Sequence, residues 1–82
     1  MNSERMEFLD GRIVIDPVVC NGKPTVRGKR ITVQTILEFL AAGDSEEELL
    51  HQYPSLERED IHACLRFAAT LTEREFTLSR VA

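Results

Sequence analysis

The sequence predicts a mainly α-helical fold, a three-helix bundle preceded by a short strand and a β-hairpin. Two observations predict this class. Apolar residues recur with helical spacing after residue 32. Before it, short β-branched runs alternate with turns that contain glycine and proline. The chain has 82 residues, which fits a single domain. A domain of this size buries only about 60% of the surface that its unfolded chain exposes, so we expect a homodimer or another partner to stabilise it.

The strand signals lie in the first third of the chain. Residues 12–15 (RIVI) form a β-branched run that ends at an Asp-Pro pair, which favours a strand followed by a turn. Residues 25–26 and 31–33 are also β-prone, and they flank the glycine-containing segment 27–30, which predicts a hairpin. An isolated hairpin is marginal in water, so we expect this one to pack on the helices or on a second subunit.

Local start and stop signals delimit the helices. Thr32 is a candidate N-cap for the first helix, and Gly43 is placed to end it. Ser45 and Glu48 form the S-x-x-E pattern of a capping box, which predicts the start of the second helix. A Pro-Ser pair follows, and we expect Ser55 to cap the third helix. These lengths match a helix-turn-helix bundle.

The third helix should bury one apolar stripe. The stripe is expected to consist of Ile61, Cys64, Leu65, Ala68 and Ala69.

We place an N-terminal arm at residues 1–11, a single helical domain at residues 12–76 and a C-terminal tail at residues 77–82.

Charge is unevenly distributed along this chain of net charge −4. Residues 20–32 carry four positive charges and no acid, whereas residues 44–60 carry seven acids against one arginine. Such polarity is typical either of a charged face that meets a partner or of a solvated surface.

Targeting signals are not evident. The first ten residues have no apolar centre, which argues against a signal peptide. The longest uninterrupted apolar run, residues 39–42, is far too short to span a membrane. Cys20 and Cys64 lie far apart without a C-x-x-C pattern, so we expect reduced thiols in a cytoplasmic protein.

The pattern of reactive residues argues against catalysis. The soft metal ligands are His51, His62, Cys20 and Cys64, and their spacing forms no ligand pair. Neither a Ser-His-Asp signature nor a P-loop is present. We therefore expect no catalytic residues, no metal and no cofactor, and a protein that is not an enzyme.

The basic segment carries a family resemblance. "GKPTVRGKRITV", residues 22–33, resembles the first block of the domain-of-unknown-function 433 family, roughly G-K-P-x-[VI]-R-G-T-R-[IV]-x-V. Further matches are an Ala-Gly helix end, "SEEEL", "YPSL" and "EDI". Lys29 departs from the threonine that is usual there. The resemblance implies a homeodomain-like helical fold and the antitoxin half of a prokaryotic toxin–antitoxin pair, whose toxin is usually a PIN-like ribonuclease.

Two interpretations of the basic segment remain open. Lys23, Arg27, Lys29 and Arg30 are candidate contacts to operator DNA, since cations there could meet phosphates. Alternatively, Arg27 and Arg30 pair with the chain's own acids and fix the hairpin to the helices, because the guanidinium fork binds carboxylates bidentately. The acidic start of the third helix, residues 57–60, would be repelled by DNA in a major groove.

A toxin could contact two other segments. Glu46 and Glu47 belong to the acidic segment and are candidates for a basic ribonuclease groove, although a solvated helix face explains them as well. Phe76 and Leu78 form an apolar segment that could order on a partner, unless Phe76 packs on the protein's own third helix. The rival function is a stand-alone DNA-binding transcriptional regulator, and a structural adaptor is a third.

Overall fold

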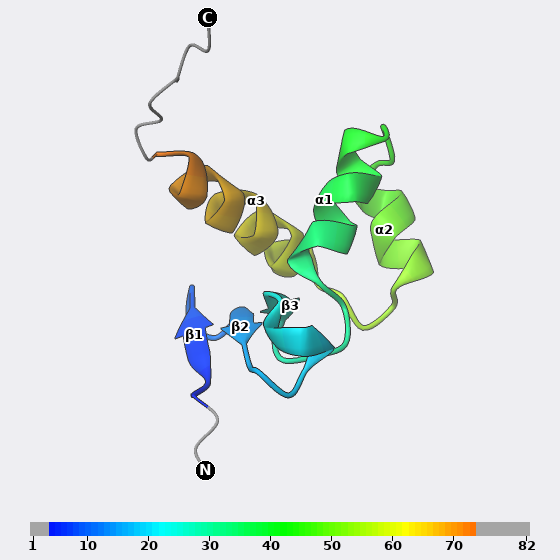
Figure 1. Ribbon diagram of the computed structural model, residues 1–82. Coiled ribbons are helices and arrows are strands. Elements are labelled where there is room, and N and C mark those ends of the chain that lie inside the picture. Colours follow the sequence, from blue (N-terminus) through cyan, green and yellow to red (C-terminus); the bar gives the residue numbers. More distant parts are fainter. Residues whose placement is uncertain (1–3, 74–82) are drawn as a thin grey trace, which may run out of the picture.

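The computed structural model describes residues 4–73, in which a small antiparallel sheet lies beside three helices (Figure 1). The three predicted helices are confirmed, and the three-stranded sheet includes one strand that the sequence did not indicate. That strand, β1, lies in the segment expected to be an arm. The elements are β1 (Met6–Phe8), β2 (Ile13–Ile15), the 3-10 turn η1 (Cys20–Gly22), β3 (Thr25–Val26), α1 (Val33–Ala41), α2 (Glu46–Gln52) and α3 (Arg58–Thr72).

The sheet has the order β1-β2-β3, with Phe8 opposite Ile13 and Ile13 opposite Val26. The first hairpin turns at Asp10-Gly11, where φ is 58° and 80°. The backbone N–H of residue 12 donates to the carbonyl of residue 9 at 3.1 Å. Positive φ at both central residues is what a type I′ turn requires, and an Asp-Gly pair favours it.

The predicted second hairpin is also present, although its return arm is short. Arg27 and Gly28 turn the chain with φ of 50° and 74°, and the Lys29 N–H donates to the Val26 carbonyl at 2.8 Å. The return arm pairs with β3 through a single bridge between Thr25 and residue 32. It is short because the chain enters α1 at the next residue.

The first two helices begin as their caps predict. The Thr32 hydroxyl accepts from the Thr35 N–H at 3.1 Å, and Gly43 follows α1 with φ of 102°. At α2, the Glu48 N–H donates to the Ser45 hydroxyl at 3.1 Å, and the Glu48 carboxylate accepts from the Ser45 N–H at 2.7 Å. The capping box is therefore confirmed in both directions. Because that hydrogen bond from the Ser45 backbone favours the charged carboxylate, it lowers the pKa of Glu48.

The third helix begins later than predicted. Its N-cap is Glu57, not Ser55, and Asp60 completes the capping box by accepting from the Glu57 N–H at 2.8 Å. The intervening residues form a turn in which the Leu56 N–H donates to the carbonyl of residue 53 at 2.9 Å. This turn places Leu56 in the core. Because residues 53–56 form the turn, α3 begins after them.

The core lies where α3 meets both α1 and the sheet. The predicted stripe on α3 is confirmed for Ile61 and Cys64, and Ala68 is half-buried. It is wrong for Leu65, which is 44% exposed, and for Ala69, which is also exposed. The cause is that α3 packs against β2 as well as α1, so its buried residues are Asp60, Ile61, Ala63 and Cys64. Within the described chain, no helix is long and apolar enough to cross a membrane. The core residues are Ile13, Val26, Val33, Ile36, Leu49, Leu56, Ile61, Ala63 and Cys64.

Candidate functional site

The buried carboxylate of Asp60 holds two arginines from the sheet end of the molecule. Asp60 is 0% exposed, on the first turn of α3. Arg27 grips it bidentately, with Nε 3.0 Å from Oδ1 and Nη2 2.7 Å from Oδ2. The Nη1 of Arg12 donates to Oδ1 at 2.7 Å. Two guanidinium groups therefore neutralise one carboxylate, which is the form in which a buried charge is tolerated.

Further hydrogen bonds extend this cluster, which we call the Asp60 clamp. Arg27 Nη2 also donates to the Ser55 carbonyl at 2.7 Å, and Arg12 Nη1 donates to Glu57 at 2.9 Å. Burial alone would raise the pKa of Asp60, but the hydrogen bonds from Arg27, the Glu57 N–H and Arg12 outweigh it and lower that pKa. The carboxylates of Glu57 and Asp60 raise the pKa of Arg12. The clamp thus ties both hairpins to the start of α3.

The clamp shows the internal pairing that one interpretation of Arg27 expected. Its guanidinium binds Asp60, and its side chain remains 31% exposed. The left-handed backbone at φ 50° costs an ordinary residue roughly 1–2 kcal/mol, and the contacts to Asp60 offset that cost. Arg12 was not predicted as a member, because an arginine beside a short strand is usually solvated.

The other three basic candidates face solvent. Lys23 and Arg30 are exposed, and Lys29 is half-buried. Over residues 4–73 none of the three takes part in an ion pair. Internal pairing of Arg30 is therefore not observed. The positive charges of these three side chains are thus not neutralised by an ion pair within the described residues.

The two acidic candidates for a partner differ in their availability. Glu46 pairs with Arg58 and lies 3.2 Å from Nε2 of His62, so it helps to hold α2 against α3. Glu47 is 74% exposed and lies 3.5 Å from Arg58, a surface arrangement that costs little to break. The two apolar candidates, Phe76 and Leu78, lie outside the described residues.

An apolar groove runs between α1 and α3, and the sequence analysis did not identify it. Its volume is about 390 Å³. Phe67, which lines it, packs against Phe8 of β1 with tilted rings whose centroids lie 5.5 Å apart, and the lining residue Leu71 is 49% exposed. The sequence signal that could have indicated it is the i, i+4 spacing of apolar residues on each helix, such as Leu37 with Ala41 and Phe67 with Leu71. The lining residues are Pro24, Val33, Gln34, Leu37, Glu38, Ala41, Phe67, Ala68 and Leu71.

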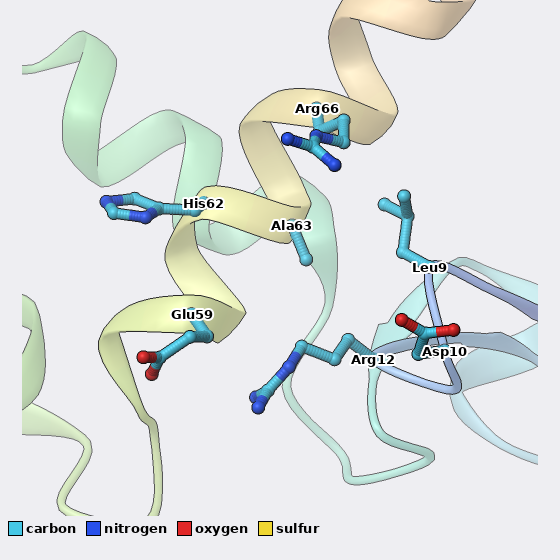
Figure 2. A pocket seen from close by; sticks show the side chains of 7 residues that line it. All are labelled: Leu9, Asp10, Arg12, Glu59, His62, Ala63 and Arg66. Carbon is cyan, nitrogen blue, oxygen red and sulfur yellow. The ribbon is translucent and has the colours of Figure 1, made fainter.

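A second hollow, of about 230 Å³, has a mixed lining of apolar side chains and charges of both signs. Figure 2 shows Glu59 and His62 extending from α3, with Leu9 and Asp10 approaching from the β1–β2 turn. Arg12, on its wall, is already bound to Asp60. Among residues 4–73, no three His, Cys, Asp or Glu side chains converge as metal ligands. Within that described range, the hollow therefore holds no metal-ligand cluster.

Cys64 lies in the core, apart from these surfaces. Cys64 is 0% exposed in the core, and burial together with the nearby Asp60 charge raises its thiol pKa to about 12. It therefore remains a protonated, unreactive core residue.

The fold and the clamp define a small three-helix domain with an N-terminal sheet, and comparison with known proteins gives its family. The family described as "Protein of unknown function (DUF433)" matches residues 13–68, so the chain belongs to it. The resemblance drawn from the basic segment is thus confirmed.

Two relatives illustrate the similarity. The chain is 35% identical over 69 residues to "Uncharacterized protein y4eO" of Sinorhizobium fredii (strain NBRC 101917 / NGR234), across 80% of this chain and 31% of that protein. The crystal structure of a DUF433 member from Anabaena variabilis ATCC 29413 matches with a TM-score of 0.72 and 35% identity, across 77% of this chain and 62% of that one. The chain therefore spans less than two thirds of each relative's length.

Proposed function

We propose that this protein is the antitoxin of a prokaryotic toxin–antitoxin pair and neutralises a PIN-like ribonuclease by binding it directly. The observation that carries the proposal is the open apolar groove between α1 and α3. A groove with apolar walls and few polar groups suits an amphipathic helix or an extended segment of another protein. Nucleic acid, by contrast, needs cations at its binding surface.

Charge supports a protein partner for this groove. Glu38 lies on the groove wall, and the chain as a whole has a net charge of −4. A ribonuclease needs a basic surface to hold RNA, and an acidic partner is attracted to such a surface and competes with RNA there. In this proposal Glu47 steers the encounter, and the groove supplies the apolar contacts that hold the complex.

The test is co-purification with a PIN-like ribonuclease encoded beside this chain, followed by an RNA-cleavage assay. We expect a stable complex and suppressed cleavage. Leu71→Asp should weaken both, because it places a charge in the groove. Val18→Asp is the matched control, because Val18 is an apolar residue, 72% exposed, that does not line the groove. A ribonuclease that is not inhibited would overturn the proposal. Equal complex formation and equal inhibition by Leu71→Asp and Val18→Asp would overturn the role of the groove in it.

Operator binding is the second candidate, favoured by the exposed Lys23 and Arg30 and the half-buried Lys29 between them. In this proposal the helices form a homeodomain-like module, but DNA meets the basic turn and not the acidic start of α3. Duplex binding should then weaken steeply with salt, and Arg30→Ala should reduce that salt slope by about one. Binding that is indifferent to Arg30→Ala and to Lys29→Ala would rule out the turn as the contact.

A further inference from the structure

The free edge of the sheet carries a self-complementary pattern. We propose that two copies of this chain pair antiparallel through β1, with Met6 opposite Met6 of the second copy, so that the two sheets join into one. This inference goes beyond the proposed function and holds or fails without any toxin.

The edge of β1 offers the backbone groups that such pairing needs. β1 lies at one end of the sheet order, and within the described chain it pairs with β2 alone. All three residues of β1 are exposed, and in Figure 1 the strand lies at the margin of the molecule, away from α1 and α2. A strand edge of this kind presents unpaired N–H and C=O groups that can template another strand.

Charge selects the second copy as the occupant and also fixes the register. Arg5 directly precedes β1, and its guanidinium lies 3.1 Å from the Glu7 carboxylate at the surface, so the two side chains lie on one face. This is the face that strand alternation predicts for residues on either side of Met6. A two-fold axis through Met6 sets the Arg5 of each copy opposite the Glu7 of the other copy, so the dimer contains two such pairs. Moving the register by two residues in either direction sets Arg5 opposite Arg5 or Glu7 opposite Glu7, which is unfavourable.

The other face of β1 supplies apolar area. Met6 is 49% exposed and Phe8 is 38% exposed, although Phe8 already packs against Phe67 of α3 with tilted rings. The two-fold axis runs perpendicular to the joined sheet, so the α3 helices of both copies lie on the same side of it. In this register Met6 meets Met6 of the second copy, and each Phe8 lies opposite the second copy's Glu4 and diagonal to its Met6. These apolar side chains lose exposed surface, as an isologous interface requires.

Complementary charge reversal tests the pairing on the full chain. The wild type should form a dimer of twice 9.3 kDa by analytical ultracentrifugation. Arg5→Glu alone and Glu7→Arg alone each set like charges opposite one another, and each should raise the dimer dissociation constant at least tenfold. An equimolar mixture of the two variants restores opposite charges across the edge, so native mass spectrometry should find the heterodimer in excess over either homodimer.

The mixture separates this pairing from the ion pair within one chain. If Arg5 and Glu7 act only within their own chain, mixing two variants restores nothing. Val18→Asp is the control for an acid placed on the surface outside β1, and it should dimerise like the wild type. Circular dichroism confirms that each variant is folded. A wild type that stays monomeric, a dimer that both reversals leave unchanged, or a mixture without heterodimer overturns the proposal.

Discussion

Replacing Asp60 with alanine should be among the most damaging changes to this fold. The substitution removes the buried carboxylate that accepts from Arg12, twice from Arg27 and from the Glu57 N–H. It therefore breaks the link between the hairpins and α3 and also removes half of the capping box that starts this helix.

The magnitude follows from the burial of the partners. Removing one member of a buried ion pair costs about 3–5 kcal/mol. Both arginine side chains are 31% exposed, so they can turn to water, which favours the lower end. The lost cap adds about 1 kcal/mol. We expect a loss of about 3–4 kcal/mol, a large fraction of the roughly 4–12 kcal/mol that an 82-residue domain has in total.

Urea unfolding followed by circular dichroism measures this loss. The midpoint should fall while the dependence on urea stays constant, which would indicate lost stability and not a changed unfolded state. Glu59→Ala is the matched control, because Glu59 is an exposed acid next to Asp60 in α3, and its effect should stay within about 0.5 kcal/mol. A loss below about 1 kcal/mol for Asp60→Ala would refute the clamp as the element that holds the hairpins.

Three further predictions concern acid, capping and thiol chemistry. Folding lowers the pKa of Asp60 below its usual 3.8, so the unfolded chain takes up the proton first, and the free energy of unfolding of the wild type should fall as pH drops below about 4. Asp60→Asn should make the free energy of unfolding less dependent on pH in this acid range. An unchanged dependence would contradict the assignment to Asp60. Ser45→Ala should lower the free energy of unfolding by about 1 kcal/mol in the same urea assay, whereas no change would mean that the capping box contributes nothing. Cys64 should react with a thiol reagent only at the rate of unfolding, so its rate should follow urea concentration, and fast labelling of the native protein would contradict its burial.

Local signals in the sequence were enough to place the first two helices. Thr32, Gly43, Ser45 and Glu48 act on backbone groups within a few residues of themselves, so their effects do not depend on the rest of the fold. Helix α3 was placed less well. Leu56 is drawn into the core by contacts distant in sequence, and those contacts delay the start of the helix.

Features built from distant residues were not determined by local signals. The pairing of Arg27 with an acid at residues 44–60 was one of two alternatives, and only the tertiary fold shows that Asp60 is its partner. Strand β1 was missed because its three residues are all exposed and its strand character depends on pairing with β2. The groove was missed because its two walls come from α1 and α3, which are separated by the 16 residues 42–57.

The basic segment therefore has two parts with different roles. Arg27 holds the Asp60 clamp. Lys23, Lys29 and Arg30 form no ion pair within the described chain. Loss of DNA binding in Arg27→Ala would combine a lost contact with a broken clamp, so substitutions of the other three residues are the sharper test of contact with DNA.

The measurement closest to the central claim is a hydrogen-exchange footprint of this protein with and without its ribonuclease. The account predicts added protection in α1 and in the C-terminal half of α3, around Leu37 and Leu71, where the groove lies. It predicts little change in the turn at residues 27–30. Protection confined to that turn, with the groove helices unchanged, would contradict the groove as the binding surface.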